Sequence, residues 1–137
     1  MSKIIINTRN HLTSIETDLI AAVKADGNYC RVYYINKREV GLTIGISRLE
    51  EMLRTNGGKR NRFIRISRSI IINHFYLHII DLQRQLVVLT DGGTQEIRLN
   101  LSKKLIKPYK EAVVQSIKIR NNHGKDYNLG QTGQPAF

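Results

Sequence analysis

Residues 62–73 read Arg-Phe-Ile-Arg-Ile-Ser-Arg-Ser-Ile-Ile-Ile-Asn, and this stretch decides more about the fold than any other part of the chain. Isoleucine and phenylalanine dominate it, which is typical of β-strands. Arg62, Arg65 and Arg68 recur among them at intervals of three residues. So much apolar surface excludes a loose basic tail. The stretch therefore predicts strands that hold a concentrated positive charge within a folded domain.

The positive charge of the chain is confined to two windows. The formal net charge is +11. Residues 52–80 contain six Lys or Arg and no acid, residues 97–110 contain five and no acid, and the rest of the chain is balanced. Phosphate backbones are the natural partner, because Lys and Arg release the counterions condensed on nucleic acids. We therefore expect a nucleic-acid-binding domain. The competing interpretation is a solvated basic face without a partner.

Length and composition indicate one globular domain. With 137 residues, of which 41% are hydrophobic, the chain can bury a core. The single cysteine, Cys30, cannot form an internal disulfide, which fits a reducing compartment. No apolar run approaches the ~20 residues of a membrane span, and polar residues interrupt the N-terminus too early for a signal peptide. We expect a cytoplasmic protein with no membrane partner, no cofactor and no evident small-molecule substrate.

The pattern along the chain predicts mainly short strands. Strands are expected over residues 15–24, 29–35, 39–44, 63–66, 70–72, 77–82, 86–90 and 95–99. Asp26-Gly27 and Asp91-Gly92 separate neighbouring strands, and Asp-Gly supplies the positive φ angles of a tight hairpin turn. The expected fold class is therefore mainly β, with two helical segments.

Those two helices have their own signals. Ser47 and Glu50 match a capping box, which predicts a helix from Ser47 to the asparagine and glycines at residues 56–58. A final helix is expected to begin near Pro108, after a turn capped by Asn100 or Ser102. Its apolar stripe would contain Leu105, Tyr109, Ala112, Val113 and Ile117. The expected division is an N-terminal extension (1–12), a domain (13–120) and a disordered tail (121–137).

Four groups of residues, in their order along the chain, resemble the LytTR DNA-binding domain of bacterial transcription regulators. They are Ala25-Asp26-Gly27-Asn28-Tyr29, Ser47-Arg48-Leu49-Glu50-Glu51-Met52-Leu53, Phe63-Ile64-Arg65-Ile66-Ser67-Arg68-Ser69-Ile70-Ile71-Ile72-Asn73, and Ile79 followed by Leu86-Val87-Val88-Leu89. The resemblance covers roughly residues 10–110. Family members commonly have His at the position of Ser67 and a Ser-Arg pair at Asn100-Leu101, so this chain departs from the pattern there.

The resemblance implies an elongated stack of small antiparallel β-sheets, with one or two short helices and a C-terminal helix. It implies sequence-specific binding of double-stranded DNA by loops inserted in successive major grooves, and a role as a bacterial transcriptional regulator rather than an enzyme. It also suggests a second copy on repeated half-sites. Members usually carry the domain behind a receiver domain or a membrane segment, and a stand-alone form is expected here.

Three DNA-contacting loops follow from the resemblance. They contain Asn28, Tyr29, Cys30 and Arg31 in the first, Arg65, Ser67, Arg68 and Ser69 in the second, and Asn100, Ser102, Lys103 and Lys104 in the third. Arg68 is the expected base contact, since a guanidinium can bond both O6 and N7 of guanine, worth ~1–3 kcal/mol. The serines of the second loop and the two lysines suit phosphate contacts, and Arg31 suits either. Cys30 stands where members often place a polar base-reading side chain.

Other functions have weaker support. An RNA-binding β-barrel module would need aromatics on an exposed sheet face; Tyr29, Tyr33 and Tyr34 are candidates, although strand alternation favours Tyr33 for the core. A nuclease would need acids near the basic windows, which have none. His74 and His78 would lie ~13 Å apart on a strand, which indicates structural histidines rather than metal ligands.

Overall fold

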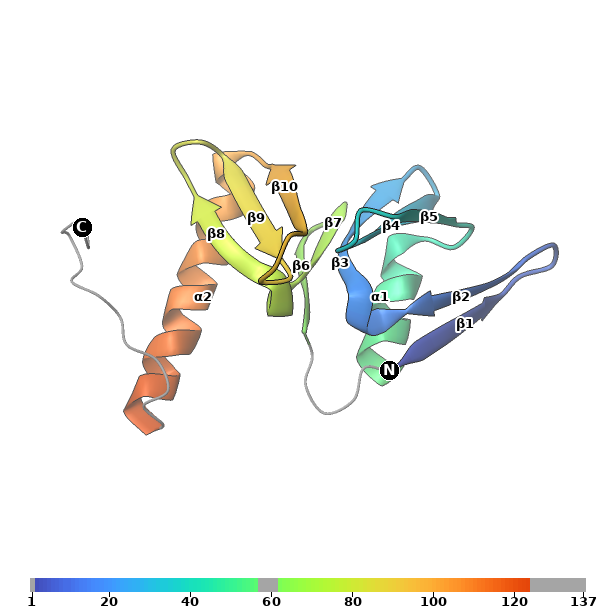
Figure 1. Cartoon of the computed structure of the whole chain (residues 1–137), viewed down its shortest axis with the longest axis horizontal. Coiled ribbons are helices and arrows are strands. Elements are labelled where there is room, and N and C mark those ends of the chain that lie inside the picture. Colours follow the sequence, from blue (N-terminus) through green and yellow to red (C-terminus); the bar gives the residue numbers. More distant parts are fainter. Residues whose placement is uncertain (1, 57–61, 124–137) are drawn as a thin grey trace.

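The structure, a computed structural model, describes residues 2–56 and 62–123. Its strands form three antiparallel sheets that follow one another along the long axis of the molecule (Figure 1). The two-stranded sheet contains β1 (Lys3–Asn7) and β2 (Leu12–Glu16). The five-stranded sheet has the order β5 (Glu39–Leu42), β4 (Tyr29–Tyr34), β3 (Ile20–Asp26), β7 (Ile70–Asn73), β6 (Phe63–Ser67). The three-stranded sheet has the order β10 (Glu96–Asn100), β9 (Leu86–Thr90), β8 (Leu77–Asp81). The predicted fold class, mainly β with two helices, is confirmed.

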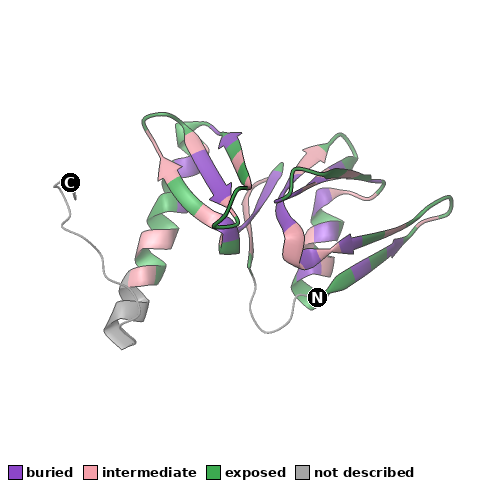
Figure 2. Ribbon diagram, viewed as in Figure 1, coloured by how far each residue is buried: buried purple, intermediate pink, exposed green. Residues whose placement is uncertain are grey.

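The five-stranded sheet separates two hydrophobic cores. One face packs against α1 (Ile46–Asn56) and the β1–β2 hairpin, and the other packs against the three-stranded sheet and α2 (Lys103–His123). The central strand β3 is consequently buried on both faces, with Ile20 to Val23 all fully covered (Figure 2). Two-sided burial explains why its sequence is a continuous apolar run instead of an alternating one.

The N-terminal residues belong to the fold. Residues 3–7, expected in an extension ahead of the domain, form β1 and pair with β2. Ile4 and Ile6 are buried in the first core beside Ile15. The single strand expected over 15–24 is wrong, because a 3-10 helix (Thr17–Leu19) divides it into β2 and β3. No glycine or proline marks this break, and contacts from elsewhere in the chain stabilise it.

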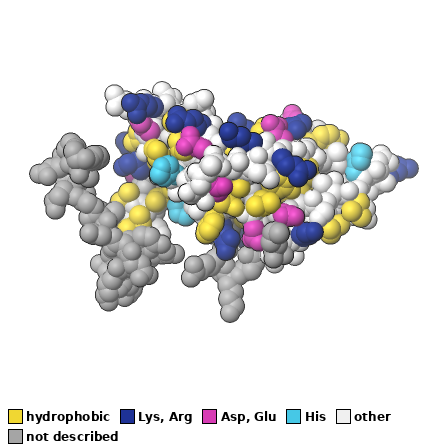
Figure 3. All heavy atoms as spheres, viewed as in Figure 1, with side chains coloured by type: hydrophobic (Ala, Val, Ile, Leu, Met, Phe, Trp, Pro, Cys, Tyr) yellow, Lys and Arg dark blue, Asp and Glu magenta, His cyan; other side chains and the backbone are white. Residues whose placement is uncertain are grey.

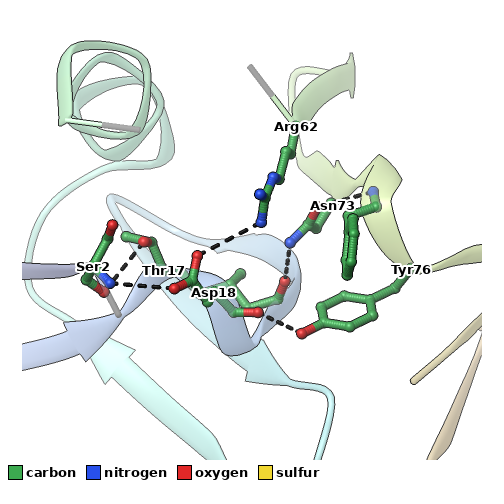
Figure 4. Close-up of polar contacts among 8 residues, drawn as sticks. Ser2, Thr17, Asp18, Arg62, Asn73 and Tyr76 are labelled. Carbon is green, nitrogen blue, oxygen red and sulfur yellow. Dashed lines mark hydrogen bonds and ion pairs between the residues drawn. The ribbon is translucent and has the colours of Figure 1, made fainter. Parts of the chain in front are cut away.

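Those contacts form a polar network between the two cores (Figure 4). The hydroxyl of Tyr76 donates to the carbonyl oxygen of Asp18, and the Asp18 carboxylate lies 3.6 Å from the Arg62 guanidinium. The buried Asn73 side chain donates to the Ile20 carbonyl at 2.7 Å and accepts from the Phe75 N–H at 3.0 Å. Backbone groups left free by the 3-10 turns thus obtain partners, as buried polar groups require.

The orientation of β4 differs from the prediction for its tyrosines. Cys30, Val32 and Tyr34 face the first core, so Tyr34 is the buried tyrosine and Tyr33 is half-exposed. Alternation fixed the two faces of the strand correctly, but it did not reveal which face meets α1. The Lys24 ammonium lies 5.5 Å above the Tyr33 ring, a cation–π distance.

Both helices begin earlier than predicted. The Leu49 N–H donates to the carbonyl of Gly45, so α1 begins at Ile46 and Ser47 lies inside it; the predicted capping box is wrong. Helix α2 begins at Lys103 and runs through Pro108. A proline removes one backbone donor, but the helix continues through this position, with Ile106 fully buried in the second core.

The C-terminal part of the chain is described only in part. Helix α2 reaches His123 and so includes the first three residues of the predicted tail, 121–123, and residues 124–137 lie outside the described residues. No helix in the described part of the chain is long and apolar enough to cross a membrane.

Candidate nucleic-acid interface

Two turns meet at one end of the five-stranded sheet. The β3–β4 hairpin closes at the pair Asp26–Tyr29, with Gly27 at φ +61° in the tight turn. The β3–β7 ladder ends at the pair Lys24–Ile70. Because the strands are antiparallel, the β3–β4 turn and the β6–β7 turn must lie at the same end. The Ala25 N–H confirms this, donating to the Ser69 carbonyl at 2.8 Å.

The first turn presents two of its four predicted contact residues openly. Asn28 and Tyr29 are exposed, Tyr29 by 53%. Arg31 is half-exposed and lies along β5, where its guanidinium is 3.7 Å from Glu39 and passes close over Gly41. A surface ion pair of this kind contributes only ~0–1 kcal/mol, so Arg31 can leave Glu39 for a phosphate at little cost.

Cys30 is the exception in this turn. Its side chain is 1% exposed and packs in the first core, and burial raises the pKa of the thiol to about 11. A neutral side chain enclosed by core residues cannot reach a base edge. The predicted DNA contact by Cys30 is therefore not supported by its position.

The second turn projects Arg68. Its side chain is exposed and forms no ion pair with any described residue. Ser69 is also exposed, whereas Ser67 is half-buried and its hydroxyl accepts from the Ser69 N–H at 3.1 Å. Arg68 is thus the cation that this turn makes available to an external anion.

Arg65, predicted as a contact in the same loop, is engaged within the domain. Its Nε donates to the Ser67 carbonyl at 2.6 Å, and one terminal nitrogen donates to the Arg68 carbonyl at 2.7 Å. The other terminal nitrogen pairs with the Glu50 carboxylate at 2.8 Å. Arg65, the middle arginine of the three in this stretch, therefore binds the turn itself.

The third segment connects β10 to α2. Asn100 ends β10, Ser102 accepts the first helical N–H groups through its backbone carbonyl, and Lys103 and Lys104 open α2. All four side chains are exposed, and neither lysine pairs with an acid among the described residues. The helix N-terminus adds partial positive charge beside the two ammonium groups.

The three segments lie toward the same side of the molecule. The β3–β4 turn, the β6–β7 turn and the β10–α2 connection are spread along the upper side in Figure 1. The space-filling view shows Lys and Arg side chains gathered along that upper side (Figure 3). We call this surface, made of Asn28, Tyr29, Arg31, Arg68, Ser69, Asn100, Ser102, Lys103 and Lys104, the basic rim.

The sequence reasoning missed one basic neighbour of the rim. Lys24 pairs directly with Arg31 across β3 and β4, on the face that also carries Tyr33. The Asp26-Gly27 hairpin signal fixes that register, so the pairing could have been deduced from the turn. Lys24 adds a second cation, beside Arg31, near the first turn.

The two histidines considered as metal ligands have different environments. His74 Nδ1 is 3.0 Å from the Tyr109 hydroxyl, in the second core, whereas His78 is exposed on β8. Within the described ranges, no group of three or more His, Cys, Asp or Glu is arranged to hold a metal ion.

Comparison with known proteins identifies the family and the fold of the chain. The family model of the LytTr DNA-binding domain matches residues 10–113. Among solved structures, the LytTr DNA-binding domain of a Bacillus cereus protein described as a methyl-accepting/DNA response regulator is similar, with a TM-score of 0.54 at 16% identity. The match covers 82% of this chain and 97% of that one. No curated protein matches the chain.

The family match spans the three sheets from β2 onward, both helix starts, and every residue of the basic rim. With most of its length covered by that match, the chain belongs to the LytTr DNA-binding domain family.

Proposed function

We propose that this domain binds double-stranded DNA in a sequence-specific manner, with the three segments of the basic rim entering successive major grooves. Family membership supports the broader statement, DNA binding by a transcription regulator. The observation that carries the finer proposal is the position of Arg68. This arginine is exposed, has no ion pair among the described residues, and lies on the β6–β7 turn, which is hydrogen-bonded to the β3–β4 turn. The regulator would act in the bacterial cytoplasm.

The rim residues suit different tasks. Arg68 has the length and fork geometry to bond O6 and N7 of one guanine. Asn28 and Asn100 are exposed amides that could pair with adenine N6 and N7. The lysines of α2, with Ser69 and Ser102, suit phosphates, which fix register without reading sequence. Cys30 and Arg65 are left out of this set because their side chains are engaged inside the domain.

A second copy on repeated half-sites belongs to the same proposal. Half-sites one helical turn apart, ~34–36 Å, would place two domains on the same side of a duplex. Sedimentation with duplexes carrying one or two selected sites would count the bound copies. A single copy on two-site duplexes at saturation would remove this part of the proposal.

The direct experiment is fluorescence anisotropy against pools of duplex DNA and single-stranded RNA over a salt series, followed by selection of the tightest duplexes. We expect preference for duplex DNA and enrichment of a shared motif above a salt-sensitive background. Tighter binding to single strands would favour an RNA module instead. Absence of enrichment after selection would overturn sequence-specific recognition.

A further inference from the structure

The guanidinium of Arg65 joins two parts of the chain that meet beside the β6–β7 turn. We propose that Arg65 and Glu50 are positioning residues, which together fix the conformation of that turn and thereby the direction of Arg68. Helix α1 is then a structural part of the DNA-reading surface, although none of its residues belongs to the basic rim. This inference rests on the proposed function.

Arg65 uses nearly all of its hydrogen-bond donors within the domain. An arginine has five N–H donors. One terminal nitrogen of Arg65 serves both Glu50, at 2.8 Å, and the Ser47 hydroxyl, at 3.4 Å. The bonds to the carbonyls of Ser67 and Arg68 occupy two further donors. A bidentate contact to guanine or phosphate would have to break at least one of these bonds.

The turn needs such a partner because β6 contains an irregularity there. Arg65 pairs with Ile71, whereas Ser67 pairs with Ile70, so the register shifts by one residue at Ile66. A bulge of this kind bends the strand and redirects the side chains that follow it. The Ser67 and Arg68 carbonyls both receive their bonds from Arg65. The guanidinium thus stabilises the bulged conformation directly.

Glu50 fixes the guanidinium in place. Glu50 is half-buried on α1, and the buried residues Leu49 and Leu53 anchor this helix in the first core. The Arg65 side chain is 21% exposed and that of Glu50 35% exposed. This partial burial makes the pair less accessible to screening ions than a fully exposed pair. The turn is therefore connected to the first core through Arg65, Glu50 and helix α1.

Glu50→Gln separates positioning from simple charge effects. The substitution removes a negative charge near the DNA, so electrostatics alone would tighten binding. Positioning predicts the opposite for the selected site, about a fivefold loss of affinity, because a charge-assisted hydrogen bond is weakened. Non-specific affinity should stay at or slightly above that of the wild type, and the salt slope should stay close to it. Unchanged or tighter binding of the selected site by Glu50→Gln would overturn the inference.

Arg65→Lys provides a second variant that keeps the charge. A lysine cannot reach both carbonyls and the carboxylate in the fork geometry of arginine. We expect loss of specific affinity with an unchanged salt slope, whereas a phosphate contact would leave affinity nearly intact. Arg54→Lys, the same exchange at an exposed position near the other end of α1, is the matched control and should leave specific affinity within about twofold of wild type. Thermal unfolding confirms that each variant folds.

Amide hydrogen exchange tests the positioning role of Arg65 and Glu50 in the absence of DNA. The Ser69 N–H is hydrogen-bonded within the β6–β7 turn, and the Ala25 N–H is hydrogen-bonded to this turn from β3. Glu50→Gln should speed the exchange of both amides. Wild-type exchange rates at both amides would overturn the inference. Faster exchange in the variant would confirm that Arg65 and Glu50 fix the turn. If the wild-type protein then bound no duplex specifically, the proposed function would be overturned instead.

Discussion

The backbone N–H of Ala25 donates a 2.8 Å hydrogen bond to the carbonyl oxygen of Ser69. This bond continues the β3–β7 ladder beyond its last pair, Lys24–Ile70, and ties the β3–β4 turn to the β6–β7 turn. Two segments of the basic rim therefore share one rigid frame and need little ordering before they bind. Pre-organised contact groups gain affinity because the entropy of ordering them is lost on folding and not on binding.

Arg68→Ala tests the base contact. We expect affinity for the selected site to fall by the equivalent of ~1–3 kcal/mol, with a much smaller loss on random duplex DNA, because one bidentate contact is removed. Anisotropy titrations with both duplexes measure the difference. Arg54→Ala, with the same change in charge at another exposed position, is the control. An equal loss on both duplexes would make Arg68 a phosphate contact.

Lys103→Ala/Lys104→Ala tests the phosphate contacts of the third segment. Each neutralised phosphate contributes ~0.9 to the slope of log affinity against log salt. The double variant should therefore bind specific and random duplexes more weakly by similar factors, with a slope lower by about 2. The double variant Arg9→Ala/Arg54→Ala has the same net charge, with both changes outside the basic rim. A similar fall in slope for that control would show a diffuse effect of net charge.

The buried thiol of Cys30 should lower stability at alkaline pH. Burial raises the pKa of this thiol from its ordinary 9.0 to about 11. The folded state therefore binds more protons than the unfolded state between these two values. Its contribution to stability is complete below pH 9 and is lost as pH rises toward 11, by up to ~1.4 kcal/mol per pH unit.

Urea unfolding at pH 8 and pH 10.5 measures this loss. In Cys30→Ala the part of the alkaline loss that is due to the thiol should disappear. Iodoacetamide should also alkylate Cys30 far more slowly in the folded protein than in urea, because the thiolate is the reactive form. Equal alkylation rates in both states would show that the thiol is accessible in the folded protein. An alkaline loss unchanged in Cys30→Ala would show that the thiol does not cause that loss.

Local signals predicted much of the sheet structure. The strand expected over 86–90 is observed as β9, Leu86–Thr90, and the Asp26-Gly27 hairpin closes where its turn chemistry indicates. Features that depend on distant contacts were not predictable. The break at Thr17–Leu19 is stabilised by residues such as Tyr76, more than fifty positions away. Residues 3–7 contain three isoleucines, but no glycine or proline turn between them and β2 indicates that the two segments pair.

The candidate site shows the same division. The resemblance implied that Arg68, Lys103 and Lys104 lie in DNA-contacting loops, and all three side chains are exposed in the structure. Arg65 occurs in the same stretch with the same chemistry, and only its hydrogen bonds to the turn distinguish its role. Residue type alone cannot separate a cation that binds DNA from one that binds the domain's own backbone.

Asn73 should be among the most sensitive polar residues of the domain. It is 1% exposed, and its amide bonds both the Ile20 carbonyl and the Phe75 N–H. Asn73→Ala leaves both backbone groups without these partners, and each unsatisfied group costs ~1–3 kcal/mol. We expect the free energy of unfolding, measured in urea, to fall by at least ~2 kcal/mol. In Asn36→Ala, which removes an exposed bond to the Arg38 N–H, the change should stay within ~0.5 kcal/mol.

Asn73→Asp separates the two bonds. The carboxylate still accepts from the Phe75 N–H, but it places a negative charge against the Ile20 carbonyl in a buried position. This variant should be less stable than Asn73→Ala at neutral pH, because an unpaired buried charge costs more than a missing bond. Stability should recover relative to Asn73→Ala as pH falls, since a protonated carboxyl can donate to the Ile20 carbonyl. A pH-independent difference between the two variants would show that the amide does not act through this bond.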